Sequence, residues 1–193
     1  MLKIAVFASG AGSNAQKLIN YFRTHPSIKI GLIVSNKSNA GVLQIARAEA
    51  IPTLVLDKEK FFHGNAYVAE LSELGVGFIV LAGFLWKVPA PLIRSFPNKI
   101  VNIHPALLPD YGGKGMYGDF VHESVIKAGD AESGITIHFV DDQYDHGPII
   151  FQARCLVDKN DTAATLADKI HQLEHDNYPR VVEEVVNRSR YEL

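Results

Sequence analysis

The chain has 193 residues, 47% of them hydrophobic and 21% charged, a composition that predicts a globular protein with one substantial core. The net charge of -2 disfavours nucleic acid or an anionic membrane as the main partner. The one cysteine excludes an internal disulfide, no apolar run has membrane-spanning length, and the N-terminus lacks a signal-peptide pattern. These features predict a cytoplasmic protein. We expect a monomer or a homodimer.

Strand-like and helix-like segments alternate along the first hundred residues. β-Branched apolar runs predict strands, and apolar residues spaced by three or four positions predict helices. In chain order the pattern predicts strands at 2–9, 28–36, 51–57, 77–83 and 99–104, and helices at 13–25, 40–50, 66–75 and 89–95. Strands joined by helices form right-handed βαβ units. We expect an α/β, Rossmann-like doubly wound fold, with a mostly parallel sheet and helices on both faces.

The pattern changes after residue 130. The segment 133–141 alternates between apolar and polar residues, and the apolar-rich segment 147–157 follows closely. Together they predict an antiparallel C-terminal strand pair. Residues 161–187 predict a long terminal helix that is capped by Asn160 or Asp161 and is kinked or split by Pro179.

A glycine-rich stretch, SGAGSNA at 9–15, lies between the first predicted strand and the first predicted helix. Glycines allow a tight turn, and a helix N-terminus offers free N–H groups, so Gly12, Ser13 and Asn14 are candidate phosphate ligands. The stretch also fits a loose dinucleotide fingerprint. No acidic residue ends the second strand, which disfavours NAD, whereas Lys37 there leaves NADP as an alternative. A further interpretation is that Ser13 or Asn14 only caps the helix.

Asn102 and His104 stand at the end of a buried strand. Ligands bind beyond the carboxyl ends of parallel strands, and residues two apart point to the same side, so we expect both side chains to face one cleft. Pro105 and Pro109 are expected to hold the backbone that follows in an extended form. The alternative is that His104 satisfies loop carbonyls and Asn102 caps a turn.

Three carboxylates, Asp141, Asp142 and Asp145, lie between the two late strands. One of them beside His104 would raise the pKa of the imidazole and select its tautomer. An acid, an imidazole and an amide together suit acyl transfer to an amine, because donors stabilise the oxyanion and a base removes the proton. No Ser or Cys nucleophile has a supporting motif, and the eight histidines show no metal-ligand spacing, so we expect no metal.

Six segments carry a further signal: SGAGSN (9–14), SNK (35–37), VLAGF (80–84), NIHPALLP (102–109), GITIHFVDDQYDHGPIIFQ (134–152) and LEHDNYP (173–179). In this order and spacing, the chain resembles the folate-dependent phosphoribosylglycinamide formyltransferase family of purine biosynthesis. The resemblance covers nearly the whole length. It implies transfer of a formyl group from 10-formyltetrahydrofolate to the amine of 5'-phosphoribosylglycinamide.

The resemblance also implies roles for individual residues. Asn102, His104 and Asp145 match the catalytic trio, and Gly12, Ser13, Asn14 and Glu174 match the ribonucleotide-binding residues. The implied folate-binding residues are Leu85, Trp86, Lys87, Val88, Asn102, Val140, Asp141, Asp142, Gln143, Tyr144 and Asp145. We expect one formyltransferase domain over 1–193, with ribonucleotide binding in 1–100 and folate binding and catalysis in 101–193.

The chain departs from the family pattern in three places. Trp86 stands where an arginine is frequent, and either stacks on the folate or covers an edge of the core. An arginine expected near residue 64 to contact the folate is absent. The loop 111–119 is longer than in many relatives; it is either a mobile flap, with Lys114 near an anion, or a solvated surface loop.

Other functions remain as alternatives. Methionyl-tRNA formyltransferase and formyltetrahydrofolate deformylase share several signals, but each carries an extra domain that 193 residues do not accommodate. An NADP-binding reductase would use the turn at Gly10 and Gly12. A catalytically inactive folate-binding protein is disfavoured, because the whole trio is present.

Overall fold

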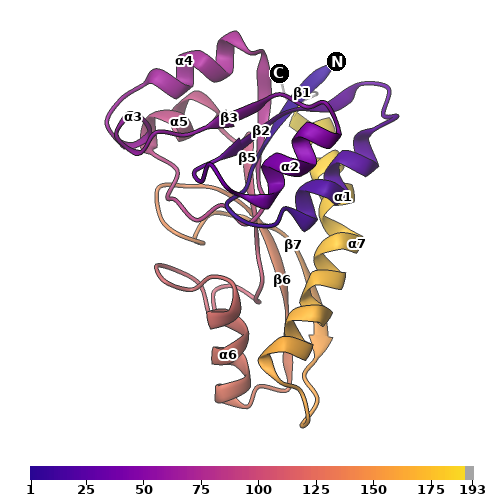
Figure 1. Cartoon of the computed structure of the whole chain (residues 1–193). Helices are drawn as coiled ribbons and strands as arrows, with labels where there is room; N and C mark the ends of the chain where they lie inside the picture. Colours follow the sequence, from indigo (N-terminus) through magenta and orange to yellow (C-terminus); the bar gives the residue numbers. More distant parts are fainter. Residues whose placement is uncertain (190–193) are drawn as a thin grey trace.

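The computed structural model describes residues 1–189, which form a seven-stranded sheet flanked by helices (Figure 1). The strands follow the order β3-β2-β1-β4-β5-β6-β7 across the sheet. Their bounds are β1 Leu2–Phe7, β2 Ile28–Ser35, β3 Thr53–Val55, β4 Val76–Leu81, β5 Ile100–His104, β6 Glu132–Phe139 and β7 Ile149–Leu156. The helices are α1 Ser13–Phe22, α2 Gly41–Ala48, α3 Lys58–Phe62, α4 Ala66–Glu73, α5 Ala90–Ser95, α6 Asp119–Ala128 and α7 Ala163–Ser189.

Strand direction divides the sheet into two parts. β1 to β5 pair in parallel, whereas β6 runs antiparallel to β5 and β7 runs antiparallel to β6. The predicted fold class is therefore confirmed: a mostly parallel α/β sheet with an antiparallel C-terminal strand pair.

Helices cover both faces of the sheet, and each face has its own buried core. On one face the apolar sides of α1, α2 and α7, with Val125 of α6, pack against side chains such as Ile4 and Val80. On the other face α3, α4 and α5 pack against side chains such as Phe7 and Ile79. Burial on both faces explains why these strands are almost continuously apolar.

The order of the strands places a crevice beside β1. The chain leaves β1 towards α1 on one face and leaves β4 towards α5 on the other, and the two loops remain joined by a hydrogen bond from Ser9 N to Gly83 O of 3.0 Å. Doubly wound sheets bind ligands at such a switch point, outside the carboxyl ends of the strands.

Two short helices, α3 and α6, were not predicted from the sequence. α6 begins at Asp119, the last residue of the loop 111–119, and buries Val121, His122 and Val125. Packing against α7, which is distant in the sequence, stabilises α6 in the folded protein.

For the terminal helix, the structure excludes the predicted split at Pro179 and the predicted caps. α7 is one element with Pro179 inside it, not two helices, because Tyr178, Pro179 and Val182 are buried against the sheet. Tyr178 Oη also donates to Leu81 O at 2.7 Å, which attaches this turn of α7 to the end of β4. The predicted caps are wrong: Thr162 Oγ1 accepts from Thr165 N at 3.2 Å, directly before the helix begins.

The chain after β5 is not extended as the two prolines predicted. Residues 105–112 form bends and turns, and the Leu108–Pro109 peptide bond is cis. Tertiary contacts hold these turns: Leu108 N donates to Thr136 Oγ1 at 3.0 Å, and Gln152 Nε2 donates to Leu108 O at 3.1 Å.

Within residues 1–189, no helix combines the length and the apolarity needed to cross a membrane. The predicted domain also includes residues 190–193, which lie outside the described part of the chain.

Candidate active site

A cavity of about 690 Å³ opens at the carboxyl edge of the sheet, at the crevice beside β1. Segments from both halves of the chain line it: Ser9 to Asn14 after β1, Ala82 to Leu85 after β4, Asn102 to Pro105 at the end of β5, and Gly113 to Gly118 before α6. Tyr144, Asp145, His122, His171 and Glu174 complete most of the remaining wall. Its volume is in the range of small-ligand sites.

The turn after β1 leaves the N-terminus of α1 open. Gly12 is the N-cap residue, with φ 89°, and no side chain caps the helix. The interpretation that Ser13 or Asn14 caps α1 is therefore wrong. A Cβ atom on Gly12 would lie 2.8 Å from Cβ of Val42, so the turn has no room for a side chain. Uncapped N–H groups at a helix N-terminus form a site for an anion such as phosphate.

Glu174 of α7 lies beside this turn although 160 residues separate it from Asn14. Asn14 Nδ2 donates to Glu174 Oε2 at 2.8 Å, and Glu174 is 6% exposed. Burial raises the pKa of Glu174, while the hydrogen bond from Asn14 and the charge of His171 oppose that rise. The structure thus brings together Gly12, Ser13, Asn14 and Glu174, the four predicted ribonucleotide-binding residues.

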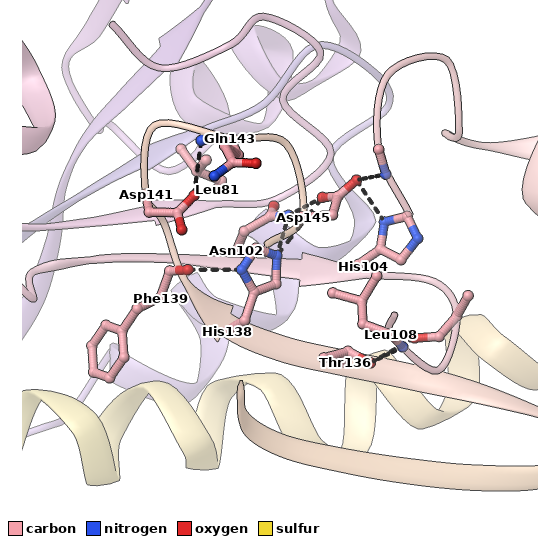
Figure 2. Close-up of polar contacts among 12 residues, drawn as sticks. Leu81, Asn102, His104, Leu108, Thr136, His138, Phe139, Asp141, Gln143 and Asp145 are labelled. Carbon is pink, nitrogen blue, oxygen red and sulfur yellow. Dashed lines mark hydrogen bonds and ion pairs between the residues drawn. The ribbon is translucent and has the colours of Figure 1, made fainter. Parts of the chain in front are cut away.

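Asn102, His104 and Asp145 also meet at this edge of the sheet (Figure 2). Asn102 Nδ2 donates to Asp145 Oδ1 at 3.4 Å, and His104 Nδ1 lies 3.6 Å from Asp145 Oδ2. Asp145 has a φ of 51°, a left-handed conformation that aspartate tolerates better than most residues. Gly147 allows the β6–β7 loop to close, because a Cβ there would lie 1.9 Å from Phe139 O.

A fourth side chain, His138 of β6, belongs to this cluster and was not among the predicted site residues. Asn102 and His138 are register partners in the β5–β6 ladder, and Asn102 Nδ2 lies 3.1 Å from His138 Nε2. His138 Nε2 is also 3.7 Å from Asp145 Oδ1. Residues two apart in a strand share a face, so His138 lies on the same face of β6 as Thr136. Only the strand register places it opposite Asn102.

The tautomers of both imidazoles follow from their carbonyl partners, which can only accept. His138 Nδ1 lies 2.8 Å from Phe139 O and therefore donates to it, which leaves Nε2 of the neutral ring to accept from Asn102. His104 Nε2 lies 2.7 Å from Tyr111 O and donates to it. In this arrangement the amide of Asn102 donates to both His138 and Asp145.

The charges of the cluster depart from the expectation in one respect. His104 is 3% exposed, and burial lowers its pKa; the nearby charge of Asp145 and the hydrogen bond to Tyr111 O raise it, but burial prevails. Burial also opposes ionisation of Asp145. Contacts with His138, His104 and Gly113 N nevertheless hold the pKa of Asp145 below its usual value, so the carboxylate is charged near neutral pH.

The loop 111–119, which we call the flap, contacts two residues of the trio, His104 and Asp145. Its first carbonyl, from Tyr111, accepts from His104, and Gly113 N donates to Asp145 Oδ2 at 3.0 Å. Tyr111 Oη donates to Asp130 Oδ2 at 2.5 Å, a bond that raises the pKa of Tyr111 to about 12 and anchors the base of the flap. Lys114 lines the cavity together with the rest of Gly113–Gly118.

Only some of the predicted folate-binding residues line the cavity. Asn102, Leu85, Tyr144 and Asp145 line the cavity. The remaining predicted residues, Trp86, Lys87, Val88, Val140, Asp141, Asp142 and Gln143, are not among its lining residues. Val88 is buried in the core, and Asp141 is held by Gln143 N at 2.8 Å and by His146 Nδ1 at 2.7 Å.

Trp86 lies in a cluster of aromatic side chains next to the cavity wall. Its ring centroid is 5.7 Å from that of Phe61, 5.4 Å from that of Phe62 and 6.4 Å from that of Phe84. Phe61 is buried, whereas Phe62 is 37% exposed, so the cluster reaches the surface. Stacking on a folate and cover of the core therefore remain compatible with its position.

No group of three or more His, Cys, Asp and Glu side chains within residues 1–189 is arranged to hold a metal ion. Two further cavity residues, His122 and His171, were also not predicted as site residues, since no local motif distinguishes them from core or surface histidines.

The fold and the site define a Rossmann-like α/β protein with an anion-binding turn and an amide–imidazole–carboxylate cluster on one cavity. The family model described as formyl transferase matches residues 2–182. A phosphoribosylglycinamide formyltransferase of Bacillus subtilis (strain 168) is 34% identical over 191 residues, covering 96% of this chain and 95% of that protein. The chain belongs to the formyl transferase family, and within it to the phosphoribosylglycinamide formyltransferases.

Two further relatives differ in how much of them the chain covers. The chloroplastic phosphoribosylglycinamide formyltransferase of Arabidopsis thaliana is 43% identical over 93% of this chain, but the chain spans only 64% of that protein. The crystal structure of phosphoribosylglycinamide formyltransferase from Bacillus halodurans superposes with a TM-score of 0.86 at 33% identity, covering 97% of this chain and 96% of that one.

Proposed function

We propose that this protein transfers the formyl group of 10-formyltetrahydrofolate to the amine of 5'-phosphoribosylglycinamide, a step of purine biosynthesis. One observation carries the proposal. An anion-binding helix N-terminus and an amide–imidazole–carboxylate cluster face the same cavity, so a phosphorylated amine and an acyl donor can meet there.

In the proposed reaction, the amine nitrogen forms a bond to the formyl carbon, whose oxygen becomes an oxyanion. The bond from that carbon to N10 of the folate then breaks, and N10 gains a proton while the amine loses one. The protein has to stabilise the oxyanion and assist the proton transfer, which are the tasks of hydrogen-bond donors and of an acid–base group.

We assign these tasks to the trio at the end of β5. His104 donates to the oxyanion as an imidazolium or proton donor, and Asn102 donates a second hydrogen bond. Asp145 favours the protonated imidazole by its charge and orders a water that accepts the amine proton. In the structure His104 donates to Tyr111 O, and Asn102 donates to His138 and Asp145. Substrate binding must therefore free one N–H of His104 and one of Asn102. Catalytic hydrogen bonds often form only in the substrate complex.

The two substrates take different parts of the chain in this proposal. The phosphate binds the N–H groups of Gly12, Ser13 and Asn14, and Glu174 also contacts the ribonucleotide. The folate binds along Leu85–Val88 and Val140–Asp145. One domain, 1–193, thus holds the ribonucleotide mainly through residues 1–100 and carries folate binding and catalysis in 101–193. We expect a cytoplasmic monomer or homodimer that needs no metal.

The testing experiment combines the purified protein with 5'-phosphoribosylglycinamide and 10-formyltetrahydrofolate and follows the absorbance of the folate product. We expect product only when both substrates are present. Product without the ribonucleotide would show hydrolysis of the folate instead, and no product in either case would overturn the proposal.

Variants of the trio test the assigned roles. Asn102→Ala removes one oxyanion donor and should lower turnover about 100- to 1000-fold. Asp145→Asn should lower turnover far more than it lowers the affinity for either substrate, because the lost interaction acts mainly in the transition state. A folded Asp145→Asn protein that turns over within a few-fold of the parent would contradict this mechanism.

A further inference from the structure

Two buried polar atoms in the cavity wall have no protein partner within residues 1–189. They are Oδ1 of Asn14 and Nδ1 of His122, and both residues line the cavity. Buried polar atoms are nearly always hydrogen-bonded, because an unsatisfied one destabilises the fold. Two such atoms in one binding cavity point to a ligand whose polar groups complete them.

His122 belongs to α6 and is 3% exposed. It has no hydrogen bond to any other described residue, although its ring is close enough to His171 and His104 to feel their charges. Burial lowers the pKa of His122, and those two histidines lower it further, whereas Asp119 opposes them. His122 is therefore neutral near pH 7, and a neutral imidazole has one N–H donor and one lone pair to offer.

Acceptors face the ligand from the α1 and α7 side of the cavity. Asn14 Nδ2 already donates to Glu174 Oε2 at 2.8 Å, which leaves Asn14 Oδ1 without a donor. The remaining oxygen of Glu174, a residue only 6% exposed, has no hydrogen bond to any part of residues 1–189. A group bound here must donate hydrogen bonds to Asn14 and Glu174.

The chemistry of these groups favours hydroxyls over phosphate. Phosphate oxygens only accept, and they would repel a Glu174 carboxylate. A hydroxyl donates one hydrogen bond and accepts others, so it can donate to Asn14 or Glu174 and accept from the N–H of His122. When the phosphate of a ribonucleotide binds Gly12, Ser13 and Asn14, its ribose hydroxyls lie close to Asn14. Asn14 then contacts both the phosphate and the ribose.

We infer that His122 is a further substrate-binding residue, which hydrogen-bonds a ribose hydroxyl opposite Asn14 and Glu174. The inference deepens the proposed function and rests on it for the identity of the sugar. His122 thereby gives the site a means of preferring a ribosyl phosphate to a phosphate ester without ring hydroxyls.

The test measures binding of two probes by calorimetry. Ribose 5-phosphate carries the hydroxyls, and tetrahydrofurfuryl phosphate has a similar ring without them. The parent should bind ribose 5-phosphate more tightly. His122→Phe keeps a planar ring but removes both nitrogens, and should weaken ribose 5-phosphate about 3- to 10-fold, the value of one hydrogen bond. Binding of tetrahydrofurfuryl phosphate should stay within about two-fold of the parent.

Two variants make the result specific. His122→Asn retains a donor and an acceptor and should restore part of the lost affinity, and it also serves if His122→Phe does not fold. His175→Phe is the matched control, because Nε2 of His175 is likewise buried without a partner among the described residues, but His175 does not line the cavity. It should bind both probes as the parent does.

Three outcomes would overturn the inference: equal affinity of the parent for both probes, an unchanged affinity of His122→Phe for ribose 5-phosphate, or an equal loss for both probes. Formyl transfer by the parent is measured separately. If the parent transfers formyl but His122→Phe binds ribose 5-phosphate normally, the proposed function holds and this role of His122 is wrong. If the parent transfers no formyl but His122→Phe loses affinity for ribose 5-phosphate as expected, the sugar contact holds and the proposed function is wrong.

Discussion

The side-chain amide of Asn102 and the imidazole of His138 face each other across the β5–β6 ladder, with Nδ2 and Nε2 3.1 Å apart. Because Nδ1 of His138 donates to Phe139 O, Nε2 is the acceptor, and the amide of Asn102 is held with its nitrogen towards Asp145. His138 is therefore a positioning residue for Asn102.

Removing the acceptor of His138 should lower turnover more than binding. His138→Phe releases Asn102, so we expect kcat to fall about 10-fold, the upper value of one oriented hydrogen bond, with KM for the ribonucleotide nearly unchanged. His138→Gln can still accept from Asn102 and should recover part of the rate. Steady-state kinetics of both variants provide the measurement. A parallel rise in KM and loss of melting temperature in His138→Phe would indicate a purely structural role.

The pKa of His104 should respond to Asp145 in a defined direction. Burial lowers this pKa and the carboxylate opposes it, so Asp145→Asn should lower it further. NMR titration of the His104 ring protons measures this, with His104→Gln used to assign the signal. A titration midpoint at or above that of the parent would contradict the arrangement of charges.

The same lowered pKa predicts how stability depends on pH. The unfolded chain binds a proton at His104 near pH 6.5, whereas the folded chain binds it only at lower pH, so protonation favours unfolding. The contribution of His104 to stability is thus full above about pH 6.5 and is lost as the pH falls below it. Melting temperatures of the parent and of His104→Gln between pH 7.5 and 5 should converge if His104 contributes.

Substitution of Gly12 should damage both stability and the phosphate site. A Cβ atom would lie 2.8 Å from Val42, and φ at this position is 89°. We expect Gly12→Ala to lose about 1–2 kcal/mol from the left-handed backbone alone, which corresponds to a fall in Tm of roughly 2–8 °C. Gly12→Val should in addition weaken ribonucleotide binding and largely spare folate binding.

Gly10 supplies the matched control for the melting experiment. A Cβ atom on Gly10 would meet nothing within 4 Å, so Gly10→Ala should melt close to the parent. Unchanged calorimetric affinity of a folded Gly12→Val protein for the ribonucleotide would exclude phosphate binding at this turn.

Tyr178 should stabilise the fold through its buried hydroxyl, which bonds to Leu81 O and, more weakly, to Val101 O. Its hydroxyl donates to Leu81 O at 2.7 Å and the side chain is fully buried, so Tyr178→Phe leaves a buried carbonyl without that donor. We expect a loss of about 1–2 kcal/mol in the free energy of unfolding, measured by urea denaturation.

The control for Tyr178 is Tyr21, an exposed tyrosine whose hydroxyl donates to Glu183 at 2.5 Å. Tyr21→Phe should cost less than about 0.5 kcal/mol, because water replaces the lost partner. Equal losses in the two variants would show that burial at Tyr178 is not the cause.

Trp86, the single tryptophan, reports on the folate site. If the folate binds along Leu85–Val88, adding a folate should quench or shift the fluorescence of Trp86, and Trp86→Phe should weaken folate binding while leaving ribonucleotide binding unchanged. Fluorescence that does not respond at saturating folate would favour the alternative that Trp86 only covers the core at Phe61.

Much of the site was predictable because its parts are local in the sequence. A strand followed by SGAGSN and a helix specifies an anion-binding turn within a few residues, and the ends of predicted parallel strands must share one edge of the sheet. The sequence therefore predicts that Asn102 and His104 face one cleft and that the β1 turn binds an anion. The family resemblance supplied the match of Asp145 and Glu174, which the spacing of residues did not identify.

Only the tertiary structure decided the partners of these residues. His138 faces Asn102 because of the β5–β6 register, and a shift of one residue would turn His138 to the other face of the sheet. His122 enters the cavity wall because α6, a helix that was not predicted from the sequence, packs against α7. The lowered pKa of His104 likewise depends on burial by segments distant in sequence. Local spacing determines which way a side chain points along its own element, whereas register, helix packing and burial are set by contacts between elements.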